Sequence, residues 1–111
     1  MHDSLGLGSG RALEGKVAII TGAASGIGEA VTRIYAANAC KVAMVDWDSQ
    51  RLDRVSKEIA AIGGEVMSIV ADVTEEDAVI KFFKDTHDRW GSIDLIVNSA
   101  GRDSLAPPVT Q

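Results

Sequence analysis

The chain has 111 residues, of which 46% are hydrophobic and 24% charged, and its formal net charge at pH 7 is −5. These values allow at most one domain, and the negative charge argues against nucleic acid or an anionic membrane as a partner. No apolar run approaches the roughly 20 residues that a membrane span needs. Because Cys40 is the only cysteine, no internal disulfide can form, and we expect a cytoplasmic protein.

Residues 1–12 form the first predicted segment, a flexible tail. The stretch is rich in glycine and serine and shows no periodicity. It also lacks the basic start and the apolar core of a secretion signal. His2 lies in this tail without a second ligand nearby, so we expect no metal site.

A glycine-rich turn follows the first predicted strand, Lys16–Thr21, whose apolar, β-branched residues are typical of a buried parallel strand. A helix is predicted after it, from about Ile27 to Ala39. Such a turn aims backbone N–H groups and the positive end of the helix dipole at one point, which suits a phosphate. The glycines are Gly22, Gly26 and Gly28, and the predicted apolar stripe of the helix is Ile27, Ala30, Val31, Ile34 and Tyr35.

The residue after Gly28 narrows the choice of ligand. A mononucleotide P-loop ends in Gly-Lys-Ser/Thr, whereas Glu29 follows Gly28 here, and its charge would repel a triphosphate. A dinucleotide, whose pyrophosphate is held mainly by backbone groups, fits the turn better.

Asp46 ends the second predicted strand, Lys41–Val45. An acidic side chain about 20 residues after the glycines is placed to hydrogen-bond both ribose hydroxyls of an adenosine. The alternative is that Asp46 only starts the turn before the next helix. A 2′-phosphate would meet the negative charge of Asp46, and Trp47 offers no compensating cation, so the pattern favours NAD over NADP.

A second helix and a third strand come next. Asp48 or Ser49 can cap this helix, and Gly63-Gly64 ends it. Its predicted apolar face consists of Leu52, Val55, Ile59 and Ile62. Glu65–Ala71 is the third predicted strand.

The last predicted unit is a third helix and a fourth strand. Thr74 and Asp77 resemble a capping box, and the helix runs to about Trp90 before the strand Asp94–Val97. The predicted buried residues of this helix are Val79, Phe82, Phe83, Thr86 and Trp90. Strands that alternate with helices in this way predict an α/β fold with a parallel, right-handed βαβ sheet.

Together these motifs resemble the amino-terminal half of a short-chain dehydrogenase/reductase. The motifs occur in that family's order and spacing: Thr21-Gly22-x-x-x-Gly26-Ile27-Gly28, Asp46, Asp72-Val73 and Asn98-Ser99-Ala100-Gly101. The resemblance implies a Rossmann-type parallel sheet with flanking helices, of which this chain holds the first four strands. On this basis residues 13–101 form the NAD-binding domain and residues 102–111 a loop.

The resemblance also implies a role for each motif in holding the dinucleotide. The glycine turn would surround the pyrophosphate, Asp46 would take the ribose, and Asp72 and Val73 would take the adenine. The turn residues are Gly22, Ser25, Gly26, Ile27 and Gly28, and those near the nicotinamide are Asn98, Ala100 and Gly101. Ser25 favours NAD, because relatives that use NADP often carry a basic residue there. Ser99 replaces the family's second asparagine, and we expect it to keep a weakened tie to the sheet.

No catalytic residue is expected between Met1 and Gln111. In the family the catalytic serine and the Tyr-x-x-x-Lys pair lie beyond the fourth strand. Tyr35, the only tyrosine, is expected to be a core residue, and Ala39 stands where the lysine would be. Hydride chemistry needs a group that gives or takes a proton. We therefore predict the cofactor-binding portion of an oxidoreductase for alcohol or carbonyl substrates, inactive alone.

Two alternatives stay open. One is a non-catalytic dinucleotide-binding or interaction module that uses the same fold. The other is a methyltransferase that binds S-adenosylmethionine, although its glycine turn is usually spaced differently. In every case the apolar strand Leu95-Ile96-Val97 would be a bare edge, which invites self-association.

Overall fold

A computed structural model of the chain describes residues 10–99, in which four parallel strands and three helices alternate. The elements are β1 (Val17–Thr21), α1 (Gly26–Ala37), β2 (Lys41–Asp46), α2 (Ser49–Ala61), β3 (Glu65–Val70), α3 (Glu76–Trp90) and β4 (Leu95–Asn98). The strand order is β3-β2-β1-β4, and every neighbouring pair is parallel. The predicted α/β class and the Rossmann-type order are confirmed.

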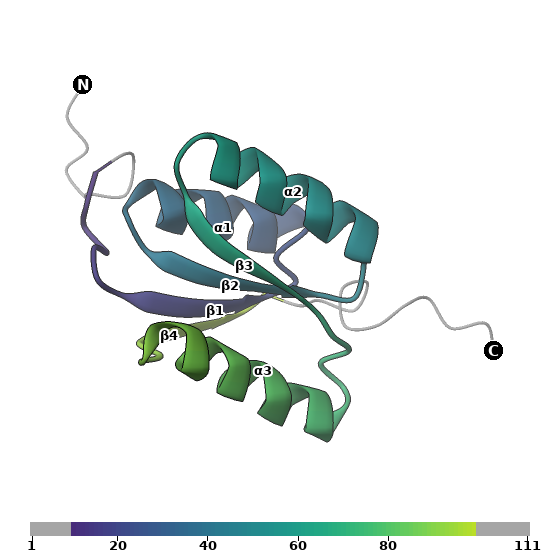
Figure 1. The fold of residues 1–111 in the computed structure, drawn as a ribbon. Coiled ribbons are helices and arrows are strands. Elements are labelled where there is room, and N and C mark those ends of the chain that lie inside the picture. Colours follow the sequence, from purple (N-terminus) through teal and green to yellow (C-terminus); the bar gives the residue numbers. More distant parts are fainter. Residues whose placement is uncertain (1–9, 100–111) are drawn as a thin grey trace.

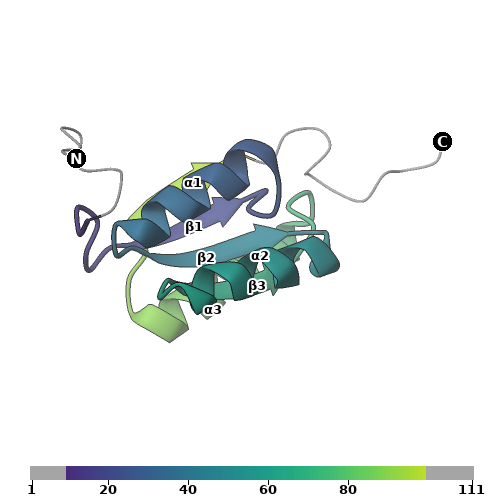
Figure 2. The same cartoon turned by 90° about the horizontal axis from the view of Figure 1, so that it is seen from above.

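The helices cover both faces of the sheet. Figure 1 shows α1 and α2 on one face and α3 on the other. On the first face α1 packs over β1 and β2, and α2 packs over β2 and β3 (Figure 2). Right-handed crossovers produce this arrangement, because the chain moves in one direction from β1 to β3 and then returns past β1 to reach β4.

The core lies on both sides of β1 and β2. Every residue of β1 is buried, and so is every residue of β2 after Lys41. Successive side chains of a strand point to opposite faces, so two covered faces require continuous apolar runs. One cluster, under α1 and α2, includes Ile20, Met44, Leu52, Val55 and Ile59. The other, under α3, is formed by Ile19, Ala43, Val45 and Phe82.

Most element ends lie within one or two residues of their predicted places. α1 ends at Ala37, two residues early, because Ala39 adopts a left-handed φ of +68° that does not continue a helix. Gly63, with φ of +96°, follows the end of α2 as predicted. The predicted cap of α2 is confirmed, since an Asp48 carboxylate oxygen accepts from the Arg51 N–H at 3.0 Å.

The predicted capping box of Thr74 and Asp77 is wrong. α3 begins at Glu76, and its N-cap residue Glu75 makes no side-chain cap bond. The Thr74 N–H and hydroxyl instead donate to Oδ1 of Asp72, at 2.8 and 2.6 Å. Threonine and aspartate make such local bonds readily, and this turn takes Thr74 out of the helix start.

Several predicted apolar positions are also wrong. Ile27 and Ile34 are 75% and 41% exposed, because α1 turns Gly28 and Thr32 toward the sheet instead. Ile62 is 81% exposed, since it lies after the last residue of α2. Of the residues predicted to be buried on α3, Phe82 and Thr86 are buried, whereas Val79, Phe83 and Trp90 are half-buried.

Two further observations bear on function classes. None of the helices within residues 10–99 is long and apolar enough to cross a membrane. Cys40 is buried, as expected for a small apolar residue, and Tyr35 packs against the cluster under α1 and α2.

Replacement of Leu52 by alanine should destabilise the fold far more than the same change at Ile62. Leu52 is fully buried, so Leu52→Ala should lower the free energy of unfolding by about 2–5 kcal/mol. Ile62→Ala, at an exposed position just after the same helix, should change it by about 0.5 kcal/mol or less. Urea titration followed by circular dichroism measures both values, and equal losses would contradict the described packing.

Candidate functional site

The carboxyl ends of the strands bring most of the predicted site residues to one edge of the sheet. Thr21 and Gly22 lie at the end of β1, Asp46 at the end of β2, and Asn98 at the end of β4. The strand order reverses between β1 and β4, and in open α/β sheets ligands bind beyond the carboxyl ends of the strands at such a point. Ala100 and Gly101 were predicted to lie here too, but they fall outside the described residues.

The three glycines of the turn serve two different purposes. Gly22 and Gly26 have φ of +66° and +56°, a left-handed conformation that strains other residues. Gly28 is required for space, because a Cβ there would lie 1.9 Å from the carbonyl oxygen of Gly22. The first turn of α1 therefore packs directly against the end of β1.

The start of α1 can receive an anion. Ser25 is the N-cap residue, and its side chain makes no cap bond to the N–H groups of the first turn. These donors belong to Gly26, Ile27 and Gly28, and they need an acceptor from outside the helix. A phosphate fits this requirement, and the helix dipole favours it. The Ile27 side chain is 75% exposed, and its backbone N–H is one of these donors.

Three side-chain hydrogen bonds join the end of β1 to residues 97–99 beside this turn, the longest from the Thr21 hydroxyl to the carbonyl oxygen of Val97 at 3.5 Å. The Thr21 hydroxyl donates to Oδ1 of Asn98 at 2.9 Å, and the Ser99 hydroxyl donates to the carbonyl oxygen of Thr21. Ser99 thus keeps a tie between the loop and the sheet. Its oxygen lies 2.5 Å from where a Cβ of Gly28 would be. The hydrogen bond from Thr21 to Asn98 was not predicted, because the sequence indicates only that Thr21 ends the first strand.

Asp46 contacts the glycine turn directly. Its side chain is buried, and its Oδ2 accepts from the Ala24 N–H at 3.0 Å. Its Oδ1 accepts from the Asp48 N–H, also at 3.0 Å, which starts the turn into α2. Since a carboxylate has about four acceptor positions, about two remain for ribose hydroxyls. Both interpretations of Asp46 are therefore compatible with its contacts.

Asp72 and Val73 make mainly local or core contacts. The hydroxyl and the N–H of Thr74 hold the pKa of the Asp72 carboxyl below its usual value. Val73 packs against the cluster under α3. It also lines a hollow of about 260 Å³ whose wall includes Thr21, Asn98, Phe82, Phe83 and Ile96. This hollow at the carboxyl edge is smaller than the roughly 300–1,000 Å³ of ordinary ligand pockets.

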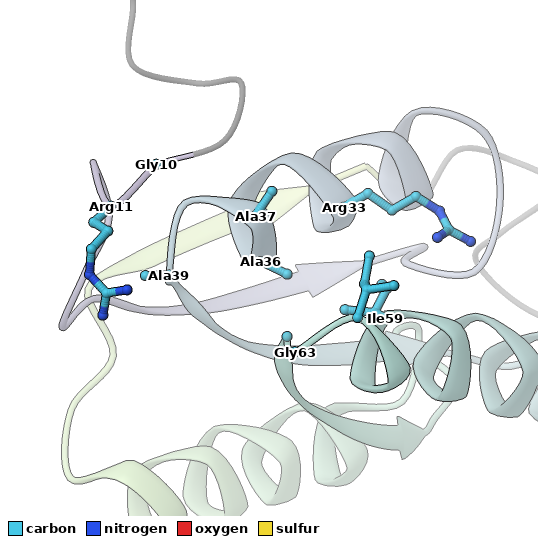
Figure 3. A pocket seen from close by; sticks show the side chains of 10 residues that line it. Gly10, Arg11, Arg33, Ala36, Ala37, Ala39, Ile59 and Gly63 are labelled. Carbon is cyan, nitrogen blue, oxygen red and sulfur yellow. The ribbon is translucent and has the colours of Figure 1, made fainter.

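A larger cavity, of about 390 Å³, lies between the last turns of α1 and α2 (Figure 3). Ala36 and Ile59 line it, with Arg11 and Arg33 at its rim. Each arginine is already paired with a carboxylate on the protein. Apart from these two arginines the cavity is lined by small and apolar residues, and it lies away from the glycine turn, so it does not form part of the candidate site.

Cys40 is not a candidate nucleophile. Burial, with a smaller effect of the Asp94 charge, raises the pKa of its thiol to about 11. The thiolate is the reactive form, so Cys40 stays protonated and unreactive near neutral pH. Within residues 10–99 no group of three His, Cys, Asp or Glu residues could hold a metal ion.

Comparison with known proteins identifies the family. Residues 16–110 match the family model described as short chain dehydrogenase. The chain belongs to the short-chain dehydrogenase/reductase family. This short-chain dehydrogenase/reductase is 41% identical over 95 residues to the 3-oxoacyl-acyl-carrier-protein reductase of Thermotoga maritima. The match covers 84% of this chain and 39% of that protein, so the chain spans about two-fifths of this curated relative.

Solved structures of the family share the fold. A metagenomic short-chain oxidoreductase in complex with NADP is 37% identical, with a TM-score of 0.76 over 80% of this chain and 40% of its own. A short-chain dehydrogenase/reductase from Burkholderia phymatum in complex with NAD is 32% identical, with a TM-score of 0.74 over 76% and 30%. The family binds NAD or NADP, and these two structures contain one of each.

Gly28→Ala should damage the site more than Gly26→Ala. The new methyl group at residue 28 would overlap the Gly22 carbonyl, so α1 must move from β1, and the free energy of unfolding should fall by about 3 kcal/mol or more. Gly26→Ala meets no atom within 4 Å and should cost only the left-handed strain, about 1–2 kcal/mol.

Urea titration measures the two losses, and circular dichroism shows whether helix content is retained. We expect both variants to keep their helices at low urea. Equal stability of Gly28→Ala and the parent chain would contradict the close packing of α1 on β1.

Proposed function

We propose that this chain is the NAD-binding portion of a short-chain dehydrogenase/reductase. The observation that carries the proposal is the glycine turn at the end of β1, where the first turn of α1 offers backbone donors. Asp46 meets the same turn from the end of β2. Membership of the family supports an oxidoreductase that moves hydride between NAD(H) and an alcohol or carbonyl compound.

Each part of the carboxyl edge has a role in this proposal. The pyrophosphate lies against the turn, Asp46 accepts from the adenosine ribose, and Asp72 and Val73 lie beside the adenine. Asn98 would lie near the nicotinamide, which supplies the hydride when the cofactor is bound, and the family motif assigns the same role to Ala100 and Gly101. The turn residues that contact the pyrophosphate are Gly22, Ser25, Gly26, Ile27 and Gly28. The N–H groups at the first turn of α1 and the exposed position of Asn98 support this orientation.

The preference for NAD over NADP rests on the charge of Asp46. Its carboxylate is buried, and no cation of residues 10–99 forms an ion pair with it. A 2′-phosphate on the ribose would bring about two negative charges against this group in a place of low dielectric. The structures of relatives hold either cofactor, so the charge at residue 46 is what supports the preference.

The proton donor for catalysis comes from outside this chain in our proposal. Tyr35 is the only tyrosine of the sequence, and it packs against the cluster under α1 and α2. Ala39, four residues later, offers no amine to lower the pKa of a tyrosine. The chain alone therefore binds the cofactor and leaves the substrate chemistry to a complete enzyme.

Calorimetric titration with both cofactors tests the proposal. We expect the chain to bind NAD at least about tenfold more tightly than NADP, and Asp46→Ala to remove most of that difference, since a hydrogen bond to a charged group contributes roughly 1.5–3 kcal/mol. Asp53→Ala, which removes an exposed carboxylate paired with Lys57, is the matched control and should leave both affinities unchanged. NADP binding as tight as NAD binding would contradict the role of Asp46.

We also propose that copies of the chain associate through β4. This edge strand contains no charged residue, and Ile96 is 55% exposed on it. The other edge strand, β3, is covered by α2 on one face and begins with Glu65, which accepts from the Trp90 indole at 2.9 Å. Natural edge strands usually carry charges or covers that prevent pairing, and β4 lacks the charge.

Analytical ultracentrifugation at increasing concentration measures this association. The parent chain of 11.7 kDa should show a rising average mass, and Ile96→Lys should remain monomeric because it places a charge on the pairing edge. Val70→Lys, at a similarly exposed position of β3, is the control and should associate like the parent. A parent chain that stays monomeric at about 100 μM would overturn the proposal.

A further inference from the structure

We infer that Asp46 is also a positioning residue, which holds the glycine turn in the shape that receives the pyrophosphate. This inference deepens the proposed function and depends on it only for the cofactor measurements below. The carboxylate joins the glycine turn, 22 residues before it in sequence, to the turn into α2, through the N–H groups of Ala24 and Asp48.

The contact with Ala24 has no substitute in the described structure. Ala24 is fully buried, so its N–H is shielded from water. The neighbouring Ala23 N–H is bonded at 3.1 Å to the carbonyl oxygen of Val45, the residue before Asp46. The middle of the turn is therefore attached to the end of β2 at two successive amides. Loss of the carboxylate would leave a buried donor unpaired, and the turn would have to move to satisfy it.

The charge of Asp46 suits this position. Among residues 10–99 no cation is paired with the buried carboxylate, and its two bonds come from backbone N–H groups just before α1 and α2. Both helix starts carry partial positive charge, which stabilises an anion between them. If residue 46 were neutral, no negative charge would lie between these two helix starts.

Asp72 provides an internal comparison. At the end of β3 it accepts from the N–H two residues later, as Asp46 does at the end of β2. Asp72 is less buried, however, and its described bonds stay within its own turn with Thr74. Only the contact of Asp46 with Ala24 reaches another loop, so the positioning role is specific to residue 46 of these two.

Amide hydrogen exchange, measured by NMR on the full chain without cofactor, tests the inference directly. In Asp46→Ala the Ala24 amide should exchange roughly 10–100 times faster than in the parent, as expected for the loss of a bond to a charged acceptor. Asparagine has one acceptor oxygen, so Asp46→Asn should release one of the two amides, of Ala24 or Asp48, and keep the other.

Asp72→Asn is the matched control for the amide measurement. It should alter the resonance of Thr74 and leave the exchange of Ala24 within about twofold of the parent. Asp46→Asn keeps the shape of the side chain and one acceptor oxygen, so its amide exchange gives an answer even if Asp46→Ala does not fold.

The two measurements separate positioning from selection. Loss of the charge that repels a 2′-phosphate changes NADP affinity whether or not the turn moves, so the comparison of cofactors tests selection. The exchange of the Ala24 amide tests positioning, and unchanged Ala24 exchange in Asp46→Ala would overturn the inference. Failure of the parent chain to bind NAD would instead refute the proposed function and leave the amide result intact.

Discussion

The close approach of α1 to the end of β1 is the constraint on which the rest of the site depends. It is possible because residue 28 has no side chain, so the helix lies against the Gly22 carbonyl. Pairing of β4 with β1 brings Ser99 to the same place, and Thr32 of α1 is buried beside it. Wider packing would move the first turn of the helix away from Asp46. The residues that recognise a cofactor therefore cannot be separated from those that pack the helix.

Much of this architecture follows from the sequence. Continuous apolar strands and amphipathic helices predict the α/β class, and the glycine turn with Asp46 predicts where the carboxyl edge would carry function. Periodicity could not predict that Ile27 and Ile34 are exposed, because it places the large apolar side chains on the face of the helix that packs on the sheet. In α1 that face holds Gly28 instead, and the missing side chain lets the helix backbone lie close to the end of β1. Thr74 was misassigned for a related reason, since its side chain can bond either a helix start or the preceding Asp72.

The site itself was predicted in outline and missed in detail. The motifs indicate which residues gather at the edge, but Asp46 could be assigned only to a ligand or to its own turn. Its bond to Ala24 depends on the separation of β1 and β2, which no local pattern encodes. Thr21 was missed because its partner Asn98 is 77 residues away. Contacts of this kind become visible only once the strand order is known.

The exposed isoleucines of α1 set a requirement for any polypeptide that covers β4. Ile27 and Ile34 lie on the side of α1 away from Arg33, which pairs with Glu29 and with Glu58 of α2. Neighbouring strands lie about 4.8 Å apart and the axes of packed helices about 8–10 Å apart, so each helix covers roughly two strands. With α1 over β1 and β2, the next helix on this face would lie beyond the isoleucines, above β4 and a fifth strand. A strand added to β4 without a helix would leave both isoleucines exposed to solvent, whereas a strand with its own helix would bury them.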